Sequence, residues 1–182
     1  YTFNVRVFDP TWFDGHGNGL ACLHDKLDQQ LEVKDSVKLR NASRAYQGFL
    51  DAGGKLRMKD LTRGLICEYL NRSIPIVAGL SSTFLYRATR EIGDDCREED
   101  IEGLPTGHVV VLCGYDRKTK MVRVADPYLP NPIAPQDNYY VVNVDRVVCA
   151  ILLGALTYDA NLMILTPSKH KGPTSGDIDC RQ

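Results

Sequence analysis

The sequence lacks the features that mark several large classes of protein. No hydrophobic run approaches the ~18 residues that cross a bilayer, and no basic segment followed by a hydrophobic one forms a signal peptide at the N-terminus. Neither sign of charge dominates, because 22 Lys and Arg oppose 23 Asp and Glu for a formal net charge of −1. These absences predict no membrane span and no nucleic-acid partner.

The cysteine pattern lacks the spacing of a metal site. None of the six cysteines forms a CxxC pair, and the neighbouring His16 and His24 have no third ligand at regular spacing. We therefore expect no metal and no cofactor. Three cysteines in hydrophobic surroundings are predicted to be core thiols: Cys67, Cys113 and Cys149. A chain of 182 residues can build a core without disulfides, which favours a reducing compartment and a cytoplasmic location.

Hydrophobic periodicity predicts helices first and strands afterwards. Helices are predicted over 19–33 (N-cap Asn18), 42–50, 61–70 (N-cap Asp60) and 145–154, and strands over 1–8, 73–79, 109–112, 121–125, 139–142 and 161–165. This order is typical of an α+β fold. We expect 1–165 to form one domain and 166–182, which is rich in Gly, Pro, Ser and Lys, to be a flexible tail.

The segment Gly107–Pro127, GHVVVLCGYDRKTKMVRVADP, is the strongest candidate for chemistry. Two hydrophobic runs flank a polar turn, and the unbroken first run predicts a strand buried on both faces. A hairpin centred on Arg117 places His108, nine residues before the centre, opposite Asp126, nine residues after it. An imidazole and a carboxylate so placed share the hydrogen bond that orients a catalytic His in hydrolases with a Ser or Cys nucleophile.

The same segment resembles the His-to-Asp hairpin of papain-like cysteine peptidases. In their bacteriocin-processing (double-glycine leader) peptidase-like branch, Gly-His, an apolar strand, Gly-Tyr-Asp and Asp-Pro follow in this order. The resemblance covers roughly residues 61–165, including the upstream strand Ile74–Ala78. It implies a papain-like fold with an antiparallel sheet, His108 as general base, Asp126 as the residue that orients it, and a peptide or protein substrate.

The N-terminal side departs from this family pattern. The family has a Gln, then Cys-Gly-x-Ala-Cys-Leu at the start of a long helix, where the helix N-terminus lowers the pKa of the first Cys and the Gln helps to form the oxyanion hole. Here the corresponding residues begin with Asn18 and end with Cys22-Leu23, and no Gln lies a few residues before them. Asn18 therefore stands where the nucleophile would be, and an amide cannot act as a thiolate.

Three interpretations remain open. In the first, the nucleophile helix lies N-terminal to Tyr1; the absence of an initiator Met and the start in a predicted strand favour this, and we expect the printed sequence to begin inside a longer precursor. In the second, the domain has lost its nucleophile and binds a peptide or a protein partner. In the third, Cys22 attacks, since it lies near a helix N-terminus with His16 and His24 nearby in sequence.

Two functions follow from these interpretations. The first is a cysteine peptidase, amidase or acyltransferase that acts on a peptide or amide bond through a Cys-His-Asp triad of Cys22, His108 and Asp126. The alternative is a catalytically inactive peptidase-like module that binds a peptide or protein. The sequence leaves open whether the chain is an enzyme, whether it hydrolyses or transfers, and its oligomeric state.

Overall fold

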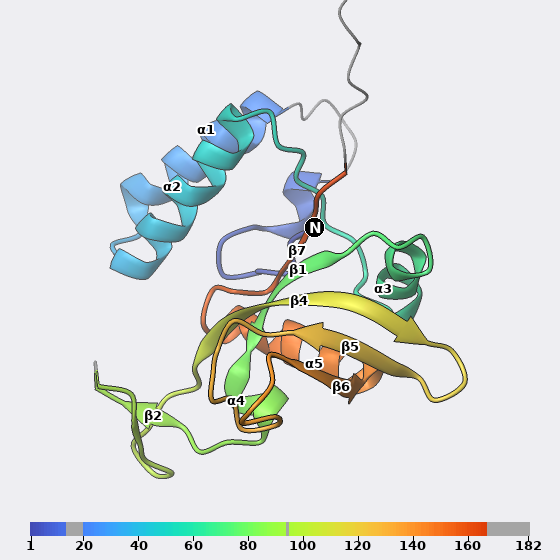
Figure 1. The fold of residues 1–182 in the computed structure, drawn as a ribbon. Coiled ribbons are helices and arrows are strands. Elements are labelled where there is room, and N and C mark those ends of the chain that lie inside the picture. Colours follow the sequence, from blue (N-terminus) through green and yellow to red (C-terminus); the bar gives the residue numbers. More distant parts are fainter. Residues whose placement is uncertain (14–19, 94, 167–182) are drawn as a thin grey trace, which may run out of the picture.

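The computed structural model describes residues 1–13, 20–93 and 95–166, and it has the predicted α+β fold (Figure 1). Asn18 and His16, like almost all of the predicted tail, lie outside the described residues. The helical elements are η1 (Pro10–Phe13), α1 (Leu20–Val33), α2 (Val37–Asp51), α3 (Arg63–Leu70), α4 (Ser82–Tyr86), α5 (Val144–Leu153) and η2 (Gly154–Leu156). The strands are β1 (Ile76–Ser81), β2 (Glu91–Ile92), β3 (Arg97–Glu98), β4 (Gly107–Asp116), β5 (Met121–Ala125), β6 (Tyr139–Asn143) and β7 (Asn161–Ile164).

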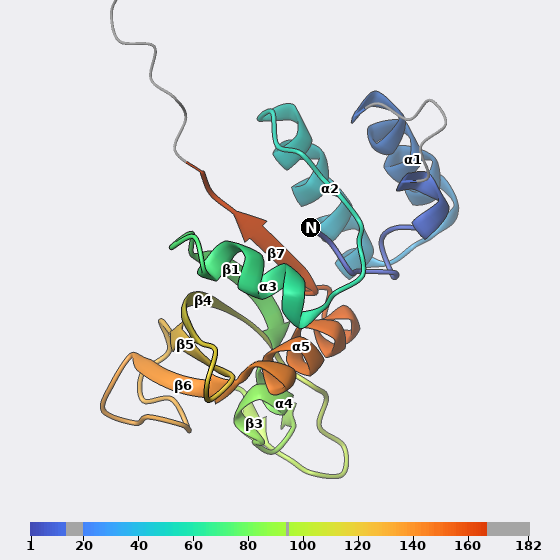
Figure 2. The same cartoon turned by 90° about the vertical axis from the view of Figure 1, so that its right-hand side faces the viewer.

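The main sheet has five antiparallel strands in the order β6-β5-β4-β1-β7, and β2 pairs with β3 separately. Alternate residues of the sheet are buried, as in Ile76, Ala78 and Leu80 of β1. They form one hydrophobic cluster with buried residues of α3, α4 and α5, and these helices lie on the same side of the sheet (Figure 2). Val109 on the other face is exposed, so the prediction of a β4 buried on both faces is wrong.

A second, smaller hydrophobic cluster holds the N-terminal segment against the hairpin of α1 and α2. Its buried members are Val7, Phe8, Leu27 and Leu39. The ring of Phe8 meets three aromatic rings edge-on, with centroid separations of 4.6 to 6.2 Å. None of the helices in the described ranges is long and apolar enough to cross a membrane.

The predicted strand over residues 1–8 is wrong. Only Thr2 forms a bridge, with Asn161, and the chain then turns, because the backbone N–H groups of Val7 and Phe8 both donate to the carbonyl of Asn4. The side chain of Asn4 is buried and accepts a hydrogen bond from the backbone of Arg6. An Asn side chain that bonds to nearby backbone favours a turn over a strand, which the alternation of hydrophobic residues did not reveal.

Hydroxyl side chains set the starts of α2 and α3. Ser36 caps α2 by accepting from the backbone of Leu39, so this helix begins five residues earlier than predicted. Thr62 caps α3 by accepting from the backbone of Leu65, and the prediction of Asp60 as its N-cap is wrong. The helix predicted over 19–33 is confirmed by α1.

Two of the predicted core thiols are not buried. Cys113 and Cys149 are exposed, and Cys67 is half-buried. Cys113 lies where the pairing of β4 with β5 shifts register, on a sheet whose covering helices all lie on one side. Cys149 lies on the side of α5 that faces away from the sheet, between the buried Val147 and Ala150.

Gly79 is required by a close backbone contact. A Cβ at this position would lie 2.0 Å from the carbonyl oxygen of Asp159. We therefore expect Gly79→Ala to lower the free energy of unfolding by about 3 kcal/mol, at the upper end of ordinary overpacking. Urea denaturation followed by circular dichroism measures this change.

Gly48→Ala is the matched control, because a Cβ there meets nothing within 4 Å inside α2. Ala has the higher helix propensity, so this change should raise the stability by about 0.5–1 kcal/mol. Equal stability of Gly79→Ala and the parent protein would contradict the contact with Asp159.

Candidate active site

His108 is the second residue of β4, where it pairs with Leu80 of β1. The residue before it is Gly107, and a Cβ there would displace the side chains of the loop before β7, since it would lie 1.7 Å from Oδ2 of Asp159 and 2.7 Å from Oγ1 of Thr157. The loop that carries these two side chains therefore packs directly against the backbone at the start of β4. The His108 side chain keeps 23% of its surface exposed, so the imidazole is accessible from solvent.

Asp126 follows the last residue of β5 and is 2% exposed. The structure brings it to His108: Nε2 of the imidazole lies 2.8 Å from Oδ1 of the carboxylate. The predicted register is nevertheless wrong by two residues. Val111 pairs with Ala125, and the next step along this ladder would set Asp126 beside Val110.

The side chains of Asp126 and His108 thus meet as diagonal neighbours on the face of the sheet covered by helices. Two local features moved the register. The first is the turn, which is closed by the pair of Asp116 and Met121, with Asp116 accepting a hydrogen bond from the backbone of Lys118. The second is a bulge between Leu112 and Gly114 of β4, on the side of the turn nearer to His108.

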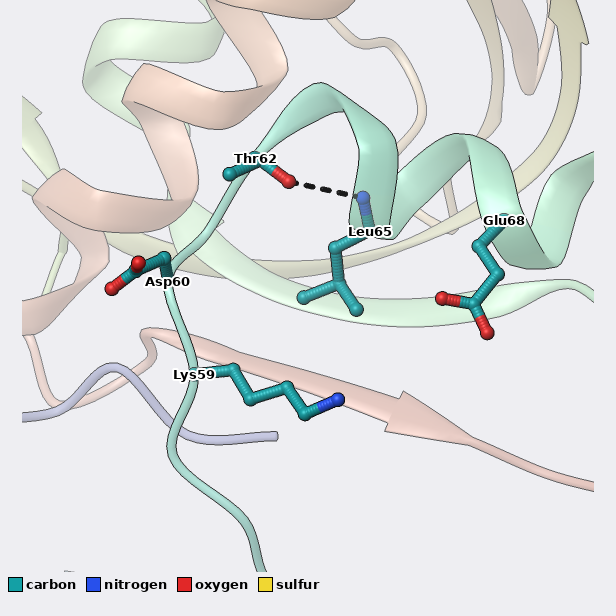
Figure 3. Close-up of a pocket in the computed structure, with 5 residues that line it drawn as sticks. All are labelled: Lys59, Asp60, Thr62, Leu65 and Glu68. Carbon is teal, nitrogen blue, oxygen red and sulfur yellow. Dashed lines mark hydrogen bonds between the residues drawn. The ribbon is translucent and has the colours of Figure 1, made fainter.

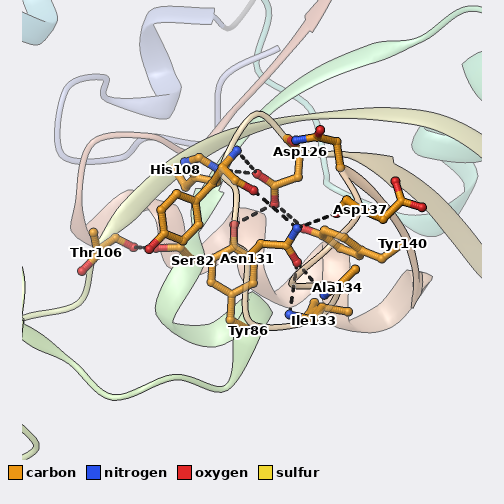
Figure 4. Close-up of polar contacts among 12 residues, drawn as sticks. Ser82, Tyr86, Thr106, His108, Asp126, Asn131, Ile133, Ala134, Asp137 and Tyr140 are labelled. Carbon is orange, nitrogen blue, oxygen red and sulfur yellow. Dashed lines mark hydrogen bonds and ion pairs between the residues drawn. The ribbon is translucent and has the colours of Figure 1, made fainter.

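The buried carboxylate of Asp126 receives four hydrogen bonds, three of which come from side chains (Figure 4). Oδ2 accepts from the hydroxyls of Tyr140 at 2.6 Å and Tyr86 at 2.7 Å. Oδ1 accepts from His108 and from the backbone N–H of Tyr128 at 2.9 Å. Burial raises the pKa of Asp126, but the bonds from Tyr140, His108, Tyr86 and Tyr128 outweigh it and hold the pKa below its ordinary value.

The pKa values of the two tyrosines that bond to Asp126 shift in the opposite direction. Burial, followed by the hydrogen bond to Asp126, raises the pKa of both Tyr86 and Tyr140, so each hydroxyl keeps its proton and remains a donor. The sequence analysis did not single out either residue. The alternation of the predicted strand 139–142 sets Tyr140 on one face with Val142, whereas no pattern links Tyr86 to a carboxylate 40 positions away.

This arrangement leaves one nitrogen of His108 for chemistry. An ionised Asp126 accepts only, so Nε2 carries the proton and Nδ1 holds the lone pair. Within the described part of the chain, no residue is recorded as hydrogen-bonded to Nδ1. The imidazole can therefore accept a proton at Nδ1 while the carboxylate stabilises the resulting cation.

Asp159 is a second carboxylate beside this imidazole, and the sequence analysis missed it. Burial raises the pKa of Asp159, whereas a hydrogen bond from Thr157 and electrostatic interactions with His108 and Lys38 act in the opposite direction. It lies 51 residues after His108 in the chain, in the loop before β7. No sequence pattern connects a loop residue with the start of a strand at that separation.

Cys22 lies in the first turn of α1 and is half-buried. Its neighbour His24 faces α2, with Asp28, Gln47 and Asp51 as partners. In both views α1 and α2 stand apart from β4 (Figures 1 and 2). Among the described residues, no hydrogen bond, ion pair or ring contact joins Cys22 to His108. The assignment of Cys22 as nucleophile stays a prediction.

A hollow of about 520 Å³ lies elsewhere, at the start of α3 (Figure 3). It is lined by Lys59, Asp60, Thr62, Leu65 and Glu68. None of these residues belongs to the network around Asp126. The described residues include no group of three or more His, Cys, Asp or Glu side chains arranged to hold a metal ion.

Comparison with known proteins identifies the family. The model of the Peptidase_C39 like family matches residues 27–141, which is more than half of the chain. The chain therefore belongs to this family. It is a cysteine peptidase-like domain related to the papain-like peptidases. The matched range contains His108 and Asp126 and begins after Cys22. No curated protein and no solved structure gave a match.

Removing one phenol should change the titration of Asp126. We expect Tyr140→Phe to raise the pKa of Asp126, because burial of the carboxylate is then opposed by one hydrogen bond fewer. Carbon-13 NMR of the side-chain carboxyl measures the pKa directly. Tyr139→Phe is the control, since Tyr139 is exposed on the opposite face of β6; equal shifts in both variants would contradict the network.

The lowered pKa of Asp126 also makes stability depend on pH. A carboxyl whose pKa is lower in the folded state adds stability above its unfolded pKa of about 3.9 and loses it as the pH falls through the folded pKa. We expect Asp126→Asn to be about 2 kcal/mol less stable at pH 7, because buried donors lose their charged acceptor. The difference in the free energy of unfolding between this variant and the parent protein should become smaller below about pH 4.

Urea denaturation between pH 7 and pH 3 measures the gap. Asp25→Asn, which changes an exposed carboxylate on α1, is the control and should match the parent protein at each pH. A gap for Asp126→Asn that stays constant across this range would show that the charge of Asp126 is not the cause.

Proposed function

We propose that the chain is a cysteine peptidase-like domain in which His108 and Asp126 serve as base and orienting residue of a Cys-His-Asp triad that acts on a peptide or amide bond. The observation that carries this proposal is the 2.8 Å contact between Nε2 of His108 and Oδ1 of a buried, four-fold hydrogen-bonded Asp126. Membership of the Peptidase_C39 like family supports a thiol as the attacking group. The resemblance of Gly107–Pro127 to the bacteriocin-processing branch supports a peptide substrate.

Each group has one role in the proposed reaction. Nδ1 of His108 takes the proton of the thiol, and the thiolate forms a C–S bond with the substrate carbonyl carbon. The imidazolium then returns this proton to the leaving nitrogen as the C–N bond breaks, which leaves a thioester. Water hydrolyses the thioester, or another amine takes the acyl group. Asp126 keeps the ring oriented throughout, and Tyr86 and Tyr140 hold Asp126 in place.

The thiol is the component that remains to be assigned. Cys22 is the candidate within this chain, since it lies in the first turn of α1, and reactive cysteines occur at helix N-termini. A nucleophile supplied from N-terminal to Tyr1 is the other source for an active enzyme.

The second candidate function is a module that kept the fold and the dyad and binds a peptide or protein without cleaving it. One observation favours it: in the described ranges, the groups that interact with the His108 ring belong to Asp126, Tyr86, Tyr128 and Asp159, and none is a cysteine. A dyad that orients no thiol still presents a polar, partly buried surface to a peptide.

Alkylation by iodoacetamide separates these possibilities. If Cys22 is the nucleophile, we expect it to react at pH 5.5 at least about tenfold faster than an ordinary thiol, because only an activated cysteine is a thiolate there. Peptide mapping by mass spectrometry gives the rate at each site. Cys113 and Cys149 are internal controls, since both are exposed and on other elements.

His108→Ala should remove this advantage of Cys22 while leaving the rates of Cys113 and Cys149 unchanged. Equal, slow labelling of all three cysteines in the parent protein would exclude Cys22 as the nucleophile. It would leave the binding module as the function of this chain alone.

A further inference from the structure

The two edge strands of the main sheet, β6 and β7, differ in what lies beside them. The N-terminal segment covers β7: the amino group of Tyr1 donates to the carbonyl of Leu162, and the N–H of Leu162 donates to the carbonyl of Tyr1. The N–H of Phe3 then donates to the carbonyl of Ala160. Within the described residues, no strand pairs with β6 on its outer side (Figures 1 and 2). An uncovered edge strand offers its backbone groups to another chain.

The hydrogen bonds at the two ends of β6 show which of its backbone groups point outward. The N–H of Asp126 donates to the carbonyl of Asn138, and the N–H of Val144 donates to the carbonyl of Lys120. Successive residues of an antiparallel strand alternate between bonding to the neighbouring strand and facing away from it. The even-numbered residues of β6 therefore bond to β5. The odd-numbered residues point their N–H and C=O groups out of the sheet, and they are Tyr139, Val141 and Asn143.

Some of these outward groups are already satisfied within the chain. The N–H of Tyr139 donates to Oδ1 of Asp137. Asn143 is the N-cap of α5, so its carbonyl accepts the first hydrogen bond of that helix. The outward groups without a hydrogen bond to any described residue are the carbonyl of Tyr139, both groups of Val141 and the N–H of Asn143.

These free groups are complementary to themselves. When two copies align antiparallel with Val141 opposite Val141, each Val141 donates to the carbonyl of the other, and the N–H of each Asn143 meets the carbonyl of Tyr139 in the other copy. Every free group is then paired, and the two satisfied groups are not needed. A foreign extended peptide would leave its own groups unpaired opposite those two, so the pattern fits a second copy of this chain.

The side chains of β6 do not oppose such a pair. The strand contains no charged residue and no proline, and its pairing with β5 has no bulge, so it lacks the devices that usually protect an edge. Val141 is 57% exposed, and in this register the two copies of it lie opposite each other. Arg123 of β5 lies over the ring of Tyr139, 4.6 Å from its centroid, so its charge is held on the face of the sheet.

The charges at the two ends of β6 are complementary in this register. The exposed Asp137 precedes the strand, whereas Lys120 and Arg146 lie at the end where β6 leads into α5. Asp145 at that end is already paired with Arg63. An antiparallel alignment therefore brings the acidic end of each β6 beside the basic end of the other.

From this we infer that β6 is a contact between two copies of this chain, which pair antiparallel about Val141 and join their sheets into one. A contact made mainly by one strand of five residues is small, so the dimer is weak and reversible. The pairing does not depend on whether the chain cleaves peptides. Because β6 also carries Tyr140, which donates to Asp126, each candidate site lies beside the contact.

Amide hydrogen exchange of the full chain, followed by NMR at two protein concentrations, tests the pairing. Between about 0.02 and about 1 mM protein, we expect exchange at Val141 and Asn143 to slow about fivefold, as mass action gives for a dimer with a Kd of about 0.1 mM. Tyr140 and Val142 are internal references, because their N–H groups already bond to β5. Exchange at Val141 and Asn143 that is the same at both concentrations would overturn the inference.

Charge variants at position 141, followed by sedimentation velocity, test the register. Val141→Lys places like charges opposite each other and should abolish the dimer, whereas an equimolar mixture of Val141→Lys and Val141→Glu should associate again. This rescue excludes misfolding as the cause of the loss. Val109→Lys is the matched control, because Val109 is 46% exposed on the same face of the sheet but on the central strand β4.

The control variant should associate as the parent protein does. An equal loss of association in Val109→Lys would show that two sheets stack face to face, and it would overturn pairing at the edge. A mixture of the two charge variants that stays monomeric would also overturn the inference.

An added peptide of extended conformation, acetyl-Thr-Val-Thr-Val-Thr-amide, covers the other occupant of this edge. Slower exchange at Val141 and Asn143 with the peptide, without any dependence on protein concentration, would make β6 a binding site for foreign strands and would overturn the second copy. None of the variants changes His108, Asp126 or Cys22, so alkylation of Cys22 reports separately on the proposed function.

Discussion

The buried carboxylate of Asp126 is the interaction on which the candidate site depends. A charge removed from water is costly unless donors replace the lost solvent, and here four donors do so. They come from α4, β4, β6 and the loop after β5. One carboxylate thus connects the ends of four separate segments, and the orientation of the His108 ring follows from the way those segments meet.

Much of the sheet was predictable because its strands follow simple rules. Period-two alternation located β5, a hydrophobic run after a Gly-His pair located β4, and a second hydrophobic run located β6. His108 and Asp126 were predictable as partners because they end two strands joined by a short turn. Only 18 residues separate them, and the observed register differs from the predicted one by two residues, which keeps both side chains on the same face of the sheet.

The remaining features depend on contacts that local patterns do not encode. The register of the hairpin differs because the turn closes at the pair of Asp116 and Met121, and a bulge beside Cys113 then shifts the pairing back by one residue; neither feature alters the hydrophobic pattern much. Asn4 turned a predicted strand by bonding to its neighbours, and Thr62 rather than Asp60 started α3. Tyr86 and Asp159 reach the site from 40 residues before Asp126 and 51 residues after His108, so only the assembled fold reveals them.

The loop before β7 is held by two glycines on neighbouring strands. Gly79 of β1 admits the carbonyl of Asp159, and Gly107 of β4 admits its carboxylate. A side chain at position 79 would meet the backbone of Asp159 and displace the loop, whereas one at position 107 would meet the ends of the Asp159 and Thr157 side chains. A loop displaced by a change at position 79 would also move the carboxylate of Asp159 relative to position 107. Among diverging relatives of this chain, the two positions and the loop should consequently change as one unit, so the apparent tolerance of either glycine would depend on the residue found at the other.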